Sequence, residues 1–337
     1  MSQIRRIIKE HQLIVFFGFT YLTTWLLLLP FLLTGDEQAY GILVLIGIFG
    51  PAFVSIIISR ALSPAPKQNP RRRRRITFLV TWAVATVIFT FNVQTTSGIE
   101  SPIAVVFYAI VGLLPAFVMA SVFSKFSAVR KSLTSLINPK GHMGWYLFAL
   151  LIIPVIRLIS IPITHQLGLD PIYEPDRIDD MSRLIGLVAV SFLYGFVFTG
   201  GLNEETGWTG FALPRLQAGY NPLIASIILW FLWILWHMPM QIAGFWNSEL
   251  ASFIRALIGT FFARFIFTWL YNKTKGGILA PMLFHVSANV SFDFLPATHA
   301  HMVLEAGLGI SIVFMARMWK KLPDRHSGVY GTTEVAA

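Results

Sequence analysis

Ten apolar stretches divide this chain, and their length constrains the fold more than any other feature. Each approaches the roughly 20 residues that a helix needs to cross the hydrocarbon core of a bilayer. Transmembrane barrel strands would alternate in polarity, which these stretches do not, so helices satisfy the backbone. The sequence therefore predicts an all-α polytopic integral membrane protein with about ten transmembrane helices. The stretches are residues 12–34, 41–59, 76–93, 102–122, 144–163, 184–202, 222–242, 253–271, 277–295 and 303–318.

The composition agrees with this class and excludes several others. Of the 337 residues, 55% are hydrophobic and only 12% are charged. Ten spans with short loops leave no room for a separate soluble domain, so we expect a multi-pass protein of the cell membrane. The chain contains no cysteine. This excludes disulfides, thiolate metal sites and cysteine nucleophiles.

The charges between the apolar stretches predict the orientation of the chain. Basic residues precede the first stretch and follow every second one, whereas the alternate loops are acidic or neutral. Because cytoplasmic loops carry an excess of Lys and Arg, both termini are predicted to be cytoplasmic. The densest cluster, Arg71–Arg75, follows Pro66 and Pro70. It predicts a basic cytoplasmic loop over residues 60–75 that contacts anionic lipid head groups, with no nucleic-acid partner.

Five polar side chains lie within or at the ends of three later stretches, where lipid should exclude them. They are Glu204, Glu205, His237, His285 and Asn289. Ionisable groups at that depth are costly unless they are paired, so they face the interior of the bundle and mark function. Five of them on three helices suggest one buried polar site in an intramembrane cavity. The carboxylates and imidazoles of such a site are suited to exchanging protons with a water molecule.

The two glutamates belong to the sequence GGLNEETGWTGFALPRLQ, residues 200–217. Gly200 and Gly201 permit a break in the helix or a close approach of another helix. Adjacent residues point about 100° apart on a helix, so one of Glu204 and Glu205 can face a cavity while the other anchors the helix. The alternative is that both carboxylates lie at the cytoplasmic head-group level, where a charge costs little.

His237 lies in an aromatic stretch, WFLWILWHMPM. We expect Trp230, Trp233 and Trp236 to pack around its ring, and Pro239 to end or kink the helix just beyond it. A single histidine on such a helix is also typical of a packing residue in an interfacial aromatic belt.

His285 and Asn289 are four residues apart, which places both on one face of a helix. An imidazole and a carboxamide can donate two hydrogen bonds to one oxygen, as stabilisation of an oxyanion requires. The alternative interpretation is a polar stripe that holds helices together.

In this order, the three motifs resemble the CPBP family over residues 184–295. These are intramembrane proteases related to the eukaryotic CAAX prenyl endopeptidase, and bacterial members are also linked to bacteriocin self-immunity. The family pattern is a glutamate pair with an arginine four positions after the second glutamate, an aromatic residue with a histidine at i+4, and a histidine with an asparagine at i+4. The matching positions here are Glu204, Glu205 and Thr209, then Trp233 and His237, then His285 and Asn289.

The resemblance implies an intramembrane endopeptidase in which Glu204 and His237 activate a water molecule, with Glu204 as general base. His285 and Asn289 would stabilise the oxyanion, and Glu205 would orient the first pair. The substrate would be a membrane-associated peptide or protein, with prenylated CAAX-type substrates as one class.

The resemblance leaves the cofactor open. The family is often described as metalloproteases, and Glu204, His237 and His285 could together hold Zn²⁺ or another divalent metal. The alternative is a metal-free mechanism that depends on glutamate. It is favoured because the chain has no HExxH helix, and because asparagine is a poor zinc ligand and a good oxyanion donor.

Two positions depart from the family pattern, since Thr209 replaces the usual arginine and Trp233 the usual phenylalanine. The first change removes a cation, which Arg157 or Arg264 in other spans could replace. The same arginines also fit a rival class, an ion-coupled membrane transporter with a proton relay. A non-catalytic bacteriocin-immunity membrane protein is the third interpretation.

The sequence thus predicts three segments. Residues 1–183 hold the first five spans with the basic loop 60–75, and residues 184–295 form the CPBP-like catalytic core. Residues 296–337 hold the last span and a disordered cytoplasmic tail.

Overall fold

The computed structural model describes residues 3–64, 70–97, 102–244 and 249–323. The chain forms two compact units. The first unit consists of Met1–Asn138 and Asp179–Gly207, and the second of Pro139–Ile178 and Trp208–Ala337. These units are interleaved along the chain and do not coincide with the three segments expected from the sequence. The predicted tail after Arg325 lies outside the described residues.

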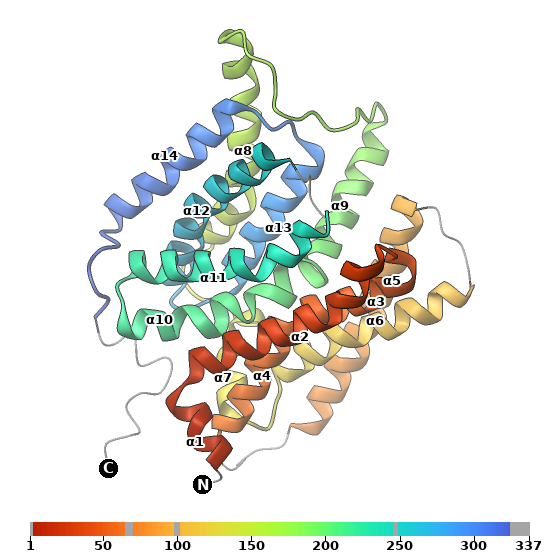
Figure 1. The fold of residues 1–337 in the computed structure, drawn as a ribbon, viewed down its shortest axis with the longest axis vertical. Coiled ribbons are helices and arrows are strands. Elements are labelled where there is room, and N and C mark those ends of the chain that lie inside the picture. The colour runs from red at the N-terminus through yellow and green to blue at the C-terminus, as the bar shows by residue number, and fades with distance from the viewer. Residues whose placement is uncertain (1–2, 65–69, 98–101, 245–248, 324–337) are drawn as a thin grey trace. The chain divides into compact units, whose positions relative to one another are not determined.

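The first unit is helical throughout its described part (Figure 1). Its core is built around α4, which packs against α2, α6 and the π-helical turn η2. The long helices α5 and α6 form a hairpin, and α9 packs against α5. The elements are α1 (Gln3–Glu10), α2 (Gln12–Thr34), α3 (Glu37–Ile48), α4 (Gly50–Leu62), α5 (Arg71–Ser97), α6 (Pro102–Ser121), α7 (Ser127–Leu133), the 3₁₀ turn η1 (Thr134–Leu136), α9 (Met181–Val197) and η2 (Gly201–Glu205).

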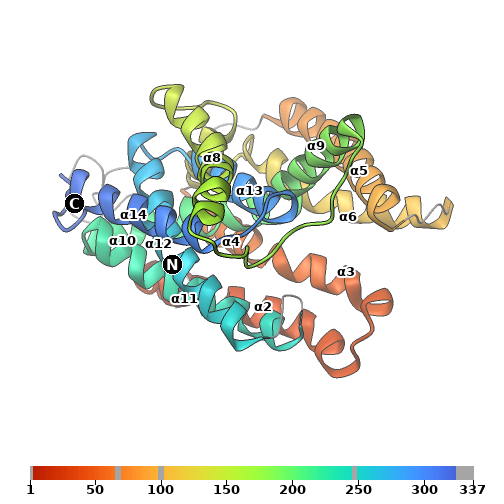
Figure 2. The same ribbon diagram turned by 90° about the horizontal axis from the view of Figure 1, so that it is seen from above.

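The second unit is a helical bundle in which α13 packs against α8, and α12 packs against α11 and α14 (Figures 1 and 2). Its core contains Ala149 of α8, Phe265 and Leu270 of α12, and Phe284 of α13. The elements are α8 (Gly144–Gln166), the π-helical turn η3 (Trp208–Ala212), α10 (Leu213–Gly219), α11 (Pro222–Ile242), α12 (Leu250–Lys273), α13 (Leu279–Phe294) and α14 (His299–Met315).

The all-α membrane fold is confirmed. Seven of the described helices are long and apolar enough to span a membrane, or eight if one bent pair counts as a span. The bend of 48° joins α3 to α4 inside the predicted span 41–59. The break falls at Phe49, and Pro51 stands in the first turn of α4, where its missing backbone donor costs no helix hydrogen bond. At 16 and 17 residues, α13 and α14 are shorter than a full span. The count of ten and the cytoplasmic termini stay predictions.

The basic run is not a loop, and that part of the prediction was wrong. Arg71–Arg75 form the first turns of α5, with the amide of Arg74 bonded to the carbonyl of Pro70 at 3.1 Å. Arginine is a good helix former, and a proline just before a helix costs no internal hydrogen bond. Pro70 therefore marks a helix start. Residues 65–69 lie outside the described part of the chain.

Candidate active site

Glu204 and Glu205, called the acid pair below, stand on a π-helical turn of the first unit. The regular helix α9 ends at Val197, and η2 begins at Gly201 after Gly200, whose φ is 95°. Only glycine adopts that φ without strain, so of the two possibilities that the glycines permitted, the break in the helix is present. A π-helical turn has i→i+5 hydrogen bonds and is wider than an α-helical turn. The acid pair is thus presented by irregular backbone.

Contacts with α3 and α4 hold this turn in place. The side-chain amide of Asn203 donates to the carbonyl of Ile48 at 3.2 Å, where α3 ends. At Gly207 a Cβ atom would lie 2.5 Å from the carbonyl oxygen of Pro51, so only glycine fits. The bend between α3 and α4 leaves the Ile48 carbonyl available to Asn203. The sequence reasoning missed Asn203, although its position directly before the acid pair was a signal.

Both carboxylates are enclosed by protein. Glu205 is fully buried, and Glu204 is 7% exposed. Charged side chains are almost never buried to this degree unless they have partners or a function. The burial of two adjacent glutamates on a π-helical turn therefore makes this turn the leading candidate for chemistry in the first unit.

His237 lies on α11 in the second unit, with aromatic rings around it. The ring centroids of Trp233 and Trp236 are 3.9 and 4.5 Å from that of His237. Trp230 points elsewhere, since its indole N–H donates to the hydroxyl of Thr260 at 3.1 Å. The helix continues through Pro239 and ends at Ile242. Two of the three expected tryptophan contacts are thus confirmed.

A backbone hydrogen bond fixes the tautomer of His237. Its Nδ1 lies 2.8 Å from the carbonyl oxygen of Trp233. A carbonyl oxygen can only accept, so Nδ1 carries the proton and Nε2 is the acceptor nitrogen of the ring. This is the arrangement in which an imidazole can accept a proton or a hydrogen bond from water through Nε2.

His285 lies on α13 and shares an aromatic neighbour with His237. Its ring centroid is 6.4 Å from that of Trp233 and 5.5 Å from that of Phe267. His237 and His285, called the histidine pair below, therefore gather around Trp233 within one unit. Asn289 lies one turn further along α13, and its side chain is exposed. The second unit thus presents two buried imidazoles and one accessible carboxamide.

Arg264 adds a buried cation beside the histidine pair. Its guanidinium carbon is 4.5 Å from the ring centroid of Phe267 and 5.7 Å from that of Trp233. Both distances are within the range of a cation–π interaction. Arg264 lies on α12, which packs against η3, the turn that carries Thr209. The sequence did not predict the ring of Phe267, which lies three residues from Arg264 on the same face of α12.

Arg157 serves a different part of the second unit. Its guanidinium donates to the carbonyl of Leu295 at 3.0 Å and lies 5.5 Å from the ring centroid of Phe292. It also interacts electrostatically with Glu305 and Asp293. These contacts fit a counter-ion role, in which the arginine balances carboxylates and ties the end of α13 to α8.

The five candidate residues are thus divided between the units. The acid pair belongs to the first unit, and the histidine pair with Asn289 belongs to the second. Among the described residues, no three side chains of histidine, aspartate or glutamate are grouped so that they could hold a metal ion.

Comparison with known proteins supplies the family. Residues 186–291 match the family described as Type II CAAX prenyl endopeptidase Rce1-like, and this interval contains all five candidate residues. Over this interval the chain is similar to the CPBP family, as the three motifs predicted. The CAAX prenyl protease 2 of Methanococcus maripaludis is 25% identical over 254 residues, which cover 72% of this chain and 90% of that protein. Both matches support a relation to the CAAX-type membrane proteases.

Proposed function

We propose that the protein is an intramembrane endopeptidase that cleaves membrane-associated proteins, with prenylated CAAX-type proteins as the substrate class. The observation that carries the proposal is the match over residues 186–291, because it includes every residue that the chemistry needs. The substrate class follows from the name of the M. maripaludis relative, a CAAX prenyl protease.

In the proposed reaction, Glu204 takes a proton from a water molecule as the water oxygen attacks the carbonyl carbon of the scissile peptide bond. His237 accepts a hydrogen bond from the same water through Nε2, which orients the water for attack. The tautomer set by the Trp233 carbonyl supports this role. General-base assistance of this kind contributes roughly 10²- to 10⁴-fold to a rate.

The tetrahedral intermediate then carries a negative oxygen. His285 and Asn289 donate hydrogen bonds to that oxygen, and Glu204 returns the proton to the amide nitrogen as the C–N bond breaks. Their i, i+4 spacing on the regular helix α13 supports a joint role. The buried Glu205 orients the first pair.

Peptide cleavage is the direct test. Purified full-length protein in proteoliposomes is incubated with a farnesylated CAAX peptide and with the same peptide lacking the lipid, and the products are identified by mass spectrometry. We expect cleavage of the farnesylated peptide, and its loss in Glu204→Ala and His285→Ala variants. Equal cleavage by the wild type and by Glu204→Ala would remove the protease assignment. Solute uptake that requires His237 would support the transporter instead.

The metal-free form of the mechanism has its own test. Metal is counted by elemental mass spectrometry on active purified protein, and activity is measured before and after dialysis against a chelator. We expect substoichiometric zinc and unchanged activity. Stoichiometric zinc that is lost together with activity would replace the glutamate-dependent mechanism by a metal-dependent one.

A further inference from the structure

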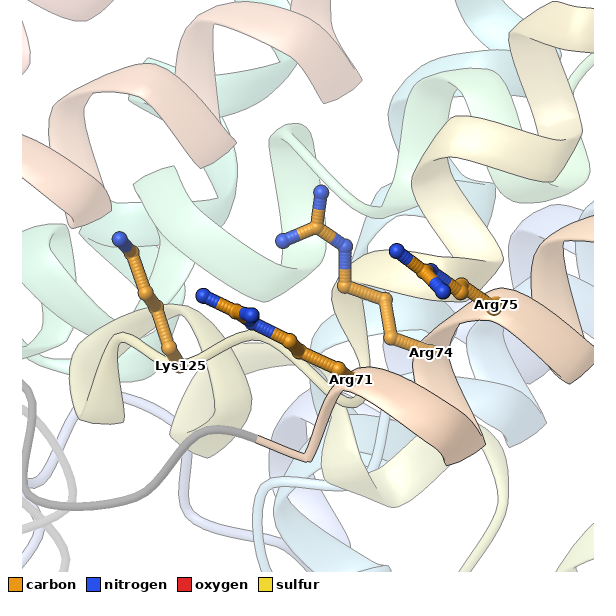
Figure 3. Close-up of a pocket in the computed structure, with 4 residues that line it drawn as sticks. All are labelled: Arg71, Arg74, Arg75 and Lys125. Carbon is orange, nitrogen blue, oxygen red and sulfur yellow. The ribbon is translucent and has the colours of Figure 1, made fainter.

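A basic hollow of about 230 Å³ lies at the start of α5 in the first unit. Arg71, Arg74 and Arg75 line it together with Lys125 (Figure 3). The three arginines stand at i, i+3 and i+4, so they share one face of the helix. Lys125 comes from the turn after α6, and Figure 3 shows it next to Arg71. The hollow is therefore a site assembled from two elements, not a run of charge on one.

Packing fixes the two elements against each other. The hairpin of α5 and α6 is tied by the indole of Trp82, which donates to the carbonyl of Ala109 at 2.7 Å. Next to Lys125, the ring of Phe126 lies between two cations, with the Arg60 guanidinium carbon at 5.0 Å and the Lys125 ammonium at 5.3 Å from its centroid. Lys125 is half-buried. Its position at the hollow is thus built into the fold.

The positive charge of the hollow has few carboxylates near it in the sequence. Between Glu37 and Asp170 the sequence holds one carboxylate, Glu100. Within the described ranges, none of the four lining cations forms an ion pair with a carboxylate. Like charges this close repel each other and raise the local concentration of anions. An external anion is the natural occupant.

An apolar hollow of about 320 Å³ adjoins the basic one. Arg74 and Arg75 line both, and Phe78 and Leu79 of the next turn of α5 complete the second. A free phosphate ion would use the basic hollow only. A molecule with an anionic head and an apolar chain would use both. Phe78 and Leu79 belong to the apolar stretch 76–93, where lipid chains are expected.

We infer that this pair of hollows binds one anionic phospholipid. Its phosphate lies among Arg71, Arg74 and Lys125, and an acyl chain runs along Phe78 and Leu79. The basic hollow is smaller than the roughly 300–1,000 Å³ of ordinary small-molecule pockets, which suits a compact head group. The site lies wholly in the first unit and is independent of the proposed peptidase chemistry.

Lipid counting by native mass spectrometry tests the inference. Full-length protein in neutral detergent is titrated with an equimolar mixture of dioleoyl phosphatidylglycerol and dioleoyl phosphatidylcholine. We expect one phosphatidylglycerol to be retained in preference. The Arg74→Gln/Lys125→Gln variant should lose about thirtyfold of that preference, from the contribution of two basic residues near an anionic group.

The chain offers matched controls for both hollows. Arg72→Gln/Arg73→Gln also removes two positive charges, both from α5, without touching the lining, and should retain most of the preference. Leu79→Ser should weaken retention severalfold more than Val80→Ser, although the two side chains are 58% and 57% exposed. Equal losses in the two charge variants would reduce the site to diffuse surface charge and overturn the inference.

A competition experiment distinguishes a bound phospholipid from a bound free anion. Inorganic phosphate at millimolar concentration should not displace bound phosphatidylglycerol, because it cannot use the apolar hollow. Displacement by phosphate alone, together with equal retention in Leu79→Ser and Val80→Ser, would assign the hollow to a free phosphate-like ion instead. All lining cations but Lys125 are exposed, so their substitution leaves the fold intact, and thermal unfolding of each variant checks this.

Discussion

The acid pair stands on a π-helical turn in the first unit, whereas the histidine pair stands on two regular α-helices in the second. Backbone contacts position the acids, through Asn203 bonded to Ile48 and Gly207 against Pro51. Side-chain rings position the histidines, through Trp233, Trp236 and Phe267. The two halves of the candidate site thus use different means to hold polar groups in an apolar environment.

This difference bears on what each half tolerates. A turn held by close backbone contacts cannot accommodate added atoms, since even one methyl group at Gly207 would clash with the backbone of Pro51. An aromatic pocket has several partners, and one ring can replace another at small cost. We therefore expect the first unit to be sensitive to small changes of shape, and the second to be sensitive mainly to loss of its polar groups.

The largest expected effect comes from removing the reactive group of either half. Glu204→Gln in the first unit and His237→Gln in the second should each lower kcat/KM for a farnesylated peptide by about 10²- to 10⁴-fold. If both act on one water, the double variant should be about as slow as the slower single variant, because groups that act as a unit are strongly non-additive.

Surface residues of the same types provide the controls for this cycle. Glu249→Gln and His299→Gln change an exposed carboxylate and an exposed imidazole, and should leave cleavage within about twofold. Losses that multiply in the Glu204→Gln/His237→Gln variant would mean that the two halves serve separate steps.

The next effect concerns Arg264, the cation of the second unit. Arg264→Gln should lower kcat by about 10- to 100-fold, the range for residues that orient a reactive group. If Arg264 replaces the arginine that the family pattern has at position 209, then adding Thr209→Arg to Arg264→Gln should restore much of kcat. Arg157→Gln should not respond to Thr209→Arg, because Arg157 contacts Leu295 and Phe292.

A lack of rescue, with equal loss of thermal stability in Arg264→Gln and Arg157→Gln, would assign Arg264 to packing alone. The measurement is a steady-state cleavage series with KM and kcat separated, beside thermal unfolding of each variant. A change in kcat without a change in unfolding temperature is what a positioning role predicts.

A smaller effect tests the contrast in shape tolerance directly. Gly207→Ala adds one methyl group in the first unit and should cost about 1–3 kcal/mol of stability, as overpacking does. Gly186→Ala is its control, because nothing lies within 4 Å of a Cβ at that position of α9. Trp233→Phe changes more atoms in the second unit but should cost less, since Trp233 is only half-buried and its carbonyl still bonds His237. Equal destabilisation by Gly207→Ala and Gly186→Ala would contradict the contrast.

Much of the fold follows from the sequence, because span length and residue burial are local properties. The apolar stretches are helical, the break at Gly200 is present, and both histidines are buried. The π-helical turn was not predictable, because it depends on contacts such as that of Asn203 with Ile48, 155 positions apart. The misread arginine run has a local cause. Pro66 and Pro70 suggested a loop, although Pro70 lies directly before a helix.

The candidate site, like the fold, was predictable from the sequence only in its local features. The shared faces of Trp233 with His237 and of His285 with Asn289 could be predicted from spacing, since i, i+4 pairs face one way on a helix. The partners that hold them could not, because Phe267 reaches His285 only through the packing of α12 against α13. The break at Phe49 was recoverable from sequence, because Pro51 inside the apolar pattern favours a new helix start just before it.

The smallest expected effect is a difference in pH dependence between the start of α9 in the first unit and the start of α11 in the second. Asp180 caps α9, and its carboxylate accepts from the backbone amides of Ser182 at 2.8 Å and Arg183 at 3.2 Å. The Ser182 hydroxyl and these amides lower the pKa of Asp180 below 3.8. The cap on α11 is neutral, since Asn221 accepts from the amide of Ile224 at 2.9 Å. The first cap can therefore titrate, and the second cannot.

Because the folded-state pKa of Asp180 is lowered, its contribution is fully present above the unfolded-state pKa of about 3.9 and is lost as pH falls through the lower folded value. Hydrogen exchange, corrected for intrinsic rates, should show the amides of residues 182 and 183 losing protection in that acid window while the Ile224 amide keeps it. Asp180→Asn should remove the pH dependence and keep the cap, because asparagine caps helices as well as aspartate does. If the amides at the starts of α9 and α11 lost protection at the same pH, the cause would be global acid unfolding. Protonation of Asp180 would then have no separate effect on the first unit.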